Sequence, residues 1–133
     1  MGGGNLDKRV VTEWLKKELI HENDKIFHNS LYDMGWLRRM GVHVGGKIHD
    51  TMFAAPLVDE NQYGYSLNKL GQRYVGEVKD ETLLEEAAKA YKINPKSEMY
   101  KLPSLNVGAY AERDAEATFG LWQEMKKEIL EFL

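Results

Sequence analysis

Two acidic residues far apart in the chain stand where an isolated charge is unusual. Asp114 lies in a stretch whose apolar residues recur every three or four positions, the spacing of a core-facing helix surface. A carboxylate on such a surface needs hydrogen bonds, an arginine or a cation, because a buried unpaired charge is strongly unfavourable. Tyr110 lies one turn earlier on the same face. The other residues of this face are Val107, Ala111, Thr118, Leu121, Trp122, Met125 and Ile129.

Asp33 is the second such carboxylate. The apolar run 26–28 predicts a short strand, and Asn29 and Ser30 are both good residues for capping the start of a helix. Asp33 then falls in the first helical turn, where the helix dipole favours an anion. Alone, this pattern is an ordinary capped helix. It becomes informative because Asn29 and Asp33, four residues apart at a strand end, are matched by a tyrosine and an aspartate on the later helix.

Together the two motifs resemble the second and third exonuclease motifs of the DEDDy 3′–5′ exonucleases, which have the ribonuclease H-like fold. They read Asn-x-x-Tyr-Asp at residues 29–33 and Tyr-x-x-x-Asp at residues 110–114. Residues 48–57 resemble the next strand and helix of that family, and residues 66–74, with Ser-Leu-x-x-Leu and a final Tyr, resemble the helix after it. The resemblance is closest to proofreading domains of phage-type and family A DNA polymerases, and it extends over about residues 5–130.

This resemblance implies two-metal hydrolysis of phosphodiester bonds at single-stranded DNA 3′ ends. Two Mg²⁺ or Mn²⁺ ions about 3.5–4 Å apart would hold the attacking water and the leaving 3′-oxygen. Asp33 and Asp114 would supply oxygen ligands, which these hard cations prefer. Tyr110 would orient the attacking water, whereas Asn29 is expected to contact the substrate backbone or to fix the turn.

Aromatic side chains near the second motif are candidates for binding a base. Tyr32 and Trp36, with Phe27, could stack on the terminal nucleotide. We expect the Trp36 side chain mainly to pack in the core.

The chain departs from the family pattern at the first motif, Asp-x-Glu on an early strand. Its one Asp-x-Glu is Asp114-Ala115-Glu116 on the predicted helix, where positions i and i+2 diverge by roughly 200°. Glu116 is therefore expected to point to solvent. We expect an α/β, ribonuclease H-like fold lacking its first three strands, with a small parallel strand pair and about six helices. Two carboxylates cannot hold two cations firmly, so the isolated chain is expected to have very low activity.

An open sheet edge also predicts association. Two strands alone give little stability, and an unpaired edge invites another chain. We therefore expect self-association, a polymerase domain, or a chain that supplies the missing strands as partner.

The apolar periodicity predicts the elements that position these residues. Residues 1–6 read as a flexible leader and 7–133 as the partial exonuclease domain. The predicted strands are 24–28 and 44–49, and a loop at 92–105 precedes the long last helix. The other predicted helices are 7–19 (with Val10, Val11, Trp14, Leu15 and Leu19 inward), 30–40 (ended by Gly41), 51–58, 66–74 and 81–91 (with Leu83, Leu84, Ala87, Ala88 and Tyr91 inward).

Composition limits the remaining classes of function. The chain has 133 residues, 43% of them hydrophobic, and no cysteine, which suits one domain in a reducing cytoplasm and excludes thiolate chemistry. It lacks an apolar run long enough for a membrane span. A net charge of −3 argues against a broad duplex-binding surface, although Arg38, Arg39, His43 and Lys47 cluster near the second motif.

Three further residues invite alternatives. His28 and His49 each end a predicted strand, but their spacing matches no compact zinc motif, so hydrogen-bonded histidines are expected. Asp50 is expected to cap the helix that starts near residue 51. Two other functions stay open: a ribonuclease D-like RNA exonuclease, and a non-catalytic module that binds nucleic acid or a partner.

Overall fold

The computed structural model describes residues 6–61, 64–74, 82–102 and 104–132. The leader predicted at residues 1–6 therefore falls almost entirely outside the described residues, as does the side chain of Leu83. The elements, in order, are α1 (Lys8–Leu19), β1 (Lys25–Phe27), α2 (Ser30–Arg39), β2 (Ile48–Asp50), α3 (Thr51–Val58), α4 (Leu67–Tyr74), α5 (Thr82–Ala90), a 3₁₀ turn η1 (Met99–Lys101) and α6 (Ser104–Phe132).

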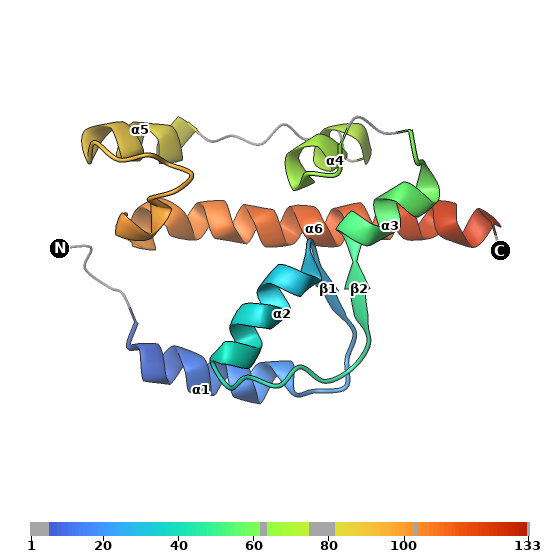
Figure 1. The fold of residues 1–133 in the computed structure, drawn as a ribbon, viewed down its shortest axis with the longest axis horizontal. Helices are drawn as coiled ribbons and strands as arrows, with labels where there is room; N and C mark the ends of the chain where they lie inside the picture. The colour runs from blue at the N-terminus through green and yellow to red at the C-terminus, as the bar shows by residue number, and fades with distance from the viewer. Residues whose placement is uncertain (1–5, 62–63, 75–81, 103, 133) are drawn as a thin grey trace.

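The long helix α6 is the central element of the fold. Helices α3, α4 and α5 pack along it, and β1 approaches it from the other side, with α2 beside the strands and α1 at their end away from α6 (Figure 1). Leu121 and Met125 of α6 are fully buried against Ala55 of α3 and Leu70 of α4. The predicted apolar face of α6 is thus confirmed in this half of the helix. Ala111, predicted on the same face, is exposed instead.

The sheet is a parallel pair, as predicted. Ile26 of β1 lies opposite His49 of β2, and Phe27 lies opposite Asp50. The second strand is shorter than predicted, because Gly45 and Gly46 belong to a loop pressed against residues 20–23. A Cβ on Gly46, whose φ is +80°, would lie 2.3 Å from the Asn23 carbonyl oxygen, so only glycine fits there.

A buried lysine holds this loop in place. Lys25 is only 9% exposed, and its ammonium donates hydrogen bonds to the His21 carbonyl, to Asn23 Oδ1 (3.1 Å) and to the Gly45 carbonyl (2.7 Å). A buried ammonium requires such partners. Lys25 therefore fixes the 41–47 loop to the turn before β1.

Helix α5 forms a second, smaller core. Its Leu84 and Ala87 are buried with Leu102, and Val107 and Tyr110 of α6 pack against them. Tyr91, predicted to face inward, is 55% exposed. It lies just past the end of α5, where the chain turns through Lys92 at a φ of +54°.

The apolar face predicted for α1 is covered only in part. Val11, Leu15 and Leu19 are half-buried, whereas Val10 is 62% and Trp14 59% exposed. The helix itself forms as predicted, with Asp7 accepting from the backbone N–H of Arg9 at 2.8 Å. What differs is that no residue of α1 is fully buried.

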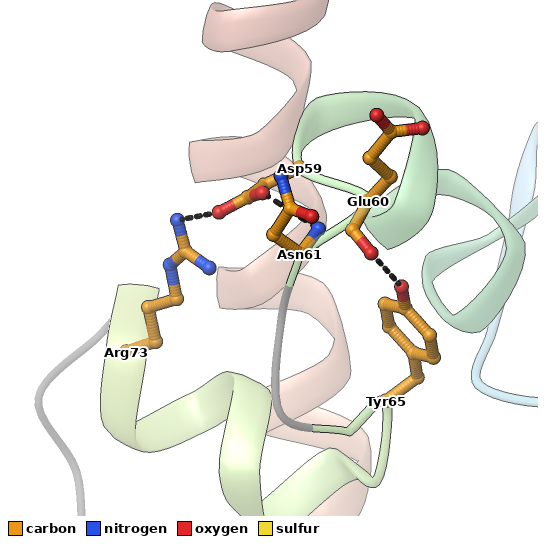
Figure 2. Close-up of polar contacts among 5 residues, drawn as sticks. All are labelled: Asp59, Glu60, Asn61, Tyr65 and Arg73. Carbon is orange, nitrogen blue, oxygen red and sulfur yellow. Dashed lines mark hydrogen bonds and ion pairs between the residues drawn. The ribbon is translucent and has the colours of Figure 1, made fainter.

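Polar contacts set the connection between α3 and α4. Arg73 Nη2 lies 2.7 Å from Asp59 Oδ2, and the Asn61 backbone N–H donates to the same carboxylate (Figure 2). The Tyr65 hydroxyl donates to the Glu60 carbonyl. These contacts keep α4 beside α6 and bring Tyr65 toward the carboxyl ends of the strands. Within the described ranges, none of the helices has the length and apolar character that a membrane span requires.

Candidate active site at the carboxyl ends of the strands

The carboxylate of Asp50 joins the two helices that begin at this edge of the sheet. It accepts the backbone N–H groups of Asn29 (3.1 Å) and Ser30 (2.6 Å) at the start of α2, and that of Met52 (2.9 Å) in α3. The predicted cap on α3 is confirmed. The predicted switch from strand to helix at Asn29 or Ser30 is confirmed, because Asn29 is the N-cap residue of α2, although its side chain makes no capping hydrogen bond.

Asn29 instead adopts a left-handed backbone conformation, with φ at +68° and ψ at +64°. Asparagine tolerates this region better than most residues, and such conformations gather at functional sites. The turn aims the backbone N–H groups of Asn29 and Ser30 at Asp50 and places Asp33 one turn into α2. Asn29 thus has a structural role in the turn, independent of any contact that its side chain makes with a substrate.

Partial burial alone would raise the pKa of Asp50, but its hydrogen bonds from Ser30, Asn29 and Met52 bring the pKa below its ordinary value. Such bonds favour the ionised form. Asp50 is therefore a structural carboxylate that the fold favours in its ionised form, and its lone pairs are largely used.

His28, the first residue after β1, interacts electrostatically with three aspartates. Its Nδ1 is 2.8 Å from Thr51 Oγ1, and the Thr51 hydroxyl donates to the Phe27 carbonyl at 3.2 Å. Partial burial lowers the pKa of His28, and the negative charges of Asp50, Asp114 and Asp33 each oppose that decrease. The predicted site carboxylates of α2 and α6 therefore both lie within electrostatic range of one imidazole. The expectation of a hydrogen-bonded histidine is confirmed.

Asp33 itself has a raised pKa. Partial burial is the main cause, the negative charge of Asp50 adds to it, and His28 opposes it. The negative charge of Asp33 is thus not fully compensated by the neighbouring groups of the folded chain. A cation placed beside it would remove that penalty.

Asp114 and Tyr110 are half-buried and one turn apart on α6. Tyr110 packs against the small core formed with α5, while the charge of Asp114 reaches His28. The Thr118 hydroxyl donates to the Asp114 carbonyl at 2.8 Å. Glu116 is exposed, as predicted from its position on the helix.

The exposed face of α2 carries two aromatic rings and a guanidinium. Tyr32 and Trp36 are 63% and 52% exposed, with ring centroids 6.4 Å apart in an edge-on contact. The Arg39 guanidinium lies 5.8 Å from the Trp36 ring centroid. The prediction that Trp36 packs in the core is therefore wrong, because α2 has no buried residue and only its other side approaches the sheet.

His49 lies apart from this site. Its Nε2 is 3.0 Å from Asp24 Oδ2, and its ring packs on Trp122 of α6 with centroids 4.6 Å apart. It ties β2 to α6. Like His28, it is a hydrogen-bonded histidine.

The donor chemistry fits a hard divalent cation only in part. Asp33 and Asp114 offer oxygen ligands of the right kind. However, the described part of the chain contains no group of three or more His, Asp or Glu side chains arranged to hold a metal. These residues suit one weakly held ion, and a two-ion site needs further carboxylates.

Sequence patterns gave little sign of two features. Asp50 was expected to cap one helix but caps two, because its partner helix begins 20 residues earlier across the parallel pair. The hydrogen bond of His28 is as predicted, but the sequence pattern does not indicate that Asp50, Asp114 and Asp33 all act electrostatically on this residue. Its position as the first residue after β1 was the available signal, since strand ends carry functional side chains in α/β folds.

Comparison with known proteins agrees with the motifs at residues 29–33 and 110–114. The family described as 3′–5′ exonuclease matches residues 5–130. The chain therefore belongs to the 3′–5′ exonuclease family, a nuclease class with a ribonuclease H-like α/β fold, as the resemblance indicated.

The curated relatives are phage DNA polymerases. The chain is 33% identical over 131 residues to a DNA-directed DNA polymerase of Pseudomonas phage M6, covering 96% of this chain and 20% of that protein. It is 28% identical over 123 residues to the DNA polymerase DpoZ of Salmonella phage PMBT28, covering 88% and 20% respectively. It is also 28% identical over 135 residues to the DNA polymerase of Escherichia phage T5, covering 90% and 16%. The chain thus spans about a fifth or less of these relatives.

Proposed function

We propose that this chain is the part of a proofreading-type 3′–5′ exonuclease that carries the second and third catalytic motifs, acting on single-stranded DNA 3′ ends. The observation that carries the proposal is that Asp33 and Asp114, from helices far apart in the sequence, both act electrostatically on His28, the residue that follows β1. The DNA substrate, rather than RNA, is supported by relatives that are named DNA polymerases.

In this proposal Asp33 and Asp114 hold Mg²⁺ or Mn²⁺, which when bound would activate water and stabilise the leaving 3′-oxygen. The raised pKa of Asp33 supports that role, because the folded chain leaves its charge in need of a cation. Tyr110, one turn before Asp114, orients the attacking water through its hydroxyl. Asn29 shapes the turn at the start of α2 and presents its amide to the substrate backbone.

Tyr32 and Trp36 form a stacking surface for the bases next to the scissile bond. Both rings are exposed and close together, and base–aromatic stacking is worth about 1–3 kcal/mol per base. The Arg39 guanidinium beside Trp36 adds a positive charge toward the phosphates. The acidic net charge of the chain does not oppose this, because bound cations and local arginines supply the positive field.

We further propose that the site is completed by carboxylates that this chain does not provide. An Asp-x-Glu on a strand places two carboxylates on one side, and the only such sequence here lies on α6. The exposed Val10 and Trp14 of α1 and the two-stranded sheet support this proposal, because added strands would cover apolar side chains and pair with an open sheet edge. Residues 7–133 then form a partial domain, which works in the cytoplasm beside a polymerase domain or a chain that supplies those strands.

The test is cleavage of 3′-labelled single-stranded DNA with Mg²⁺, with and without an added segment carrying the first motif. We expect very low activity alone and a large gain on addition. In the completed enzyme Asp33→Ala and Asp114→Ala should each reduce the rate at least a hundredfold, whereas Glu116→Ala, an exposed carboxylate on the same helix, should not. Equal rates for all three variants would show that the assigned site is wrong. Faster cleavage of RNA than of DNA would favour the ribonuclease D-like alternative.

A further inference from the structure

A shallow pocket lies at the carboxyl end of α2, away from the acidic site at its start. Its volume is about 300 Å³, and its lining residues are Met34, Arg38, Gly41, Val42, His43 and Val44. The pocket therefore combines an apolar floor with a guanidinium and an imidazole. Small-molecule sites commonly have this composition.

The backbone around the pocket is firmly held. The N–H of Val42 donates to the Leu37 carbonyl at 2.8 Å and that of Gly41 to the Arg38 carbonyl at 3.0 Å, which closes the end of α2. The Gly45 N–H donates to the Leu19 carbonyl, and Lys25 binds the Gly45 carbonyl. The concave shape is thus preformed by the same contacts that fix the 41–47 loop.

The charge around the pocket is positive although the whole chain is acidic. Arg38 and His43 are exposed, and neither forms an ion pair with another residue of the described ranges. The Lys16 side chain passes over Gly41, where a Cβ would lie 3.9 Å from Lys16 Cε. Glu13, which pairs with Lys16 at 3.3 Å, balances that lysine and leaves the charge of Arg38 unopposed.

The position of the pocket relates it to the acidic site. Arg38 follows Asp33 by five residues on one helix, a rise of about 7.5 Å and a rotation of about 140° around the helix axis. The pocket therefore lies further along α2 than Asp33 and on a different side of the helix. A strand whose 3′ end lies at the start of α2 would pass partly around the helix to place an upstream phosphate at Arg38.

We propose that this pocket is a second nucleic-acid subsite, in which Arg38, assisted by His43, binds a backbone phosphate of the single strand upstream of the scissile bond. The apolar floor of Met34, Val42 and Val44 receives the neighbouring sugar or base. This inference rests on the proposed function and adds a contact to it. Arg38 here is a binding residue that does not touch the reacting atoms.

The test is binding without cleavage, by fluorescence anisotropy of labelled (dT)₈ in the absence of divalent metal, using the full chain. Arg38→Gln should weaken binding about tenfold, as expected for one charge-assisted hydrogen-bonded contact. It should also reduce the slope of log Kd against log salt concentration by about 0.7. His43→Gln should weaken binding less. Arg9→Gln is the matched control, because it removes the same charge from an exposed arginine on α1.

Competition by thymidine 5′-monophosphate separates the subsite from the terminal-nucleotide site. Its affinity should be the same in wild type and Arg38→Gln, since a mononucleotide cannot reach both ends of α2. The inference is overturned if Arg38→Gln and Arg9→Gln weaken (dT)₈ binding equally, if the mononucleotide is affected as much as (dT)₈, or if wild type does not bind (dT)₈. The proposed nuclease function is judged separately, by cleavage in the completed enzyme.

Discussion

Asp50 Oδ2 accepts a 2.6 Å hydrogen bond from the backbone N–H of Ser30, so the end of β2 closes the first turn of a helix that begins 20 residues earlier. The other oxygen of the same carboxylate accepts from Asn29 and Met52. One side chain thereby sets the relative positions of α2 and α3. The placement of Asp33 relative to the sheet depends on it.

We predict that Asp50→Ala lowers the free energy of unfolding by about 2 kcal/mol, because each lost helix cap is worth about 1 kcal/mol. Chemical denaturation at pH 7 measures this. Asp7→Ala, which removes a single exposed cap from α1, is the control and should lower it by about 1 kcal/mol or less. Equal losses in the two variants would contradict the double role of Asp50.

The stabilisation by Asp50 should also depend on pH. Its pKa is lowered in the folded chain, so its contribution is complete above the unfolded value of about 3.9 and is lost as the pH falls through the folded pKa. The difference in unfolding free energy between wild type and Asp50→Ala should therefore shrink below about pH 4. A difference that is unchanged down to pH 2 would contradict this.

The charge of Asp33 should affect the stability of the chain in the opposite direction from that of Asp50. Its raised pKa means that the ionised form is less favourable in the folded than in the unfolded chain, although the helix dipole partly compensates. We predict that Asp33→Asn stabilises the chain at pH 7 by up to about 1 kcal/mol, in keeping with the gains seen when functional groups are removed. The gain should vanish below about pH 4, where the carboxylate is protonated in both states. Thermal unfolding at pH 3.5 and pH 7 tests the sign, and a destabilised variant at pH 7 would refute it.

Local sequence patterns predicted the helices and strands well, because capping residues, glycines and apolar periodicity act within each element. The helix at 51–58 is found as predicted, and Gly41 ends α2 with the expected positive φ of +77°. That Asp33 and Asp114 belong to one site could be proposed only through the family resemblance. Periodicity places each on a helix face but does not say which helices meet.

The errors have a shared physical origin. Trp14, Trp36 and Tyr91 are large and apolar, and their spacing places each on a helix side that usually faces a core. Whether such a side is buried depends on which other elements are present to cover it. For α1 and α2 the described chain covers these sides only in part, and no residue of either helix is fully buried. Hydrophobic spacing thus predicts which side of a helix is apolar, whereas tertiary packing decides whether that side is buried.

Lys25 gives a further prediction, for the loop that borders the proposed phosphate pocket. Lys25→Met should lower the free energy of unfolding by about 2–4 kcal/mol, because it removes the hydrogen bonds that this buried ammonium donates, and bonds to a charged group contribute about 1.5–3 kcal/mol each. Lys16→Met, on the exposed side of α1, should change it by less than about 0.5 kcal/mol. Urea denaturation compares them. A Lys25→Met chain as stable as Lys16→Met would show that the three hydrogen bonds do not fix the loop.

The uncovered face of α1 makes self-association testable. Val10 and Trp14 are adjacent on the helix surface and largely exposed, and a contiguous apolar patch of this kind favours contact with another chain. We predict that the chain associates at micromolar concentration, as measured by sedimentation velocity. Trp14→Ser combined with Val10→Ser should yield a monomer without lowering the free energy of unfolding at low concentration, since neither side chain is buried in the single chain.

The control for this surface is Leu57→Ser combined with Tyr100→Ser, which changes two large side chains elsewhere that are even more exposed. If this control also abolishes association, the contact is a general effect of surface hydrophobicity and not a property of α1. If wild type sediments as a monomer, the α1 face does not bind a second copy. An added segment carrying the first motif then becomes its expected occupant, and it should protect the amides of α1 and β1 from hydrogen exchange, because a strand added beside β1 buries both.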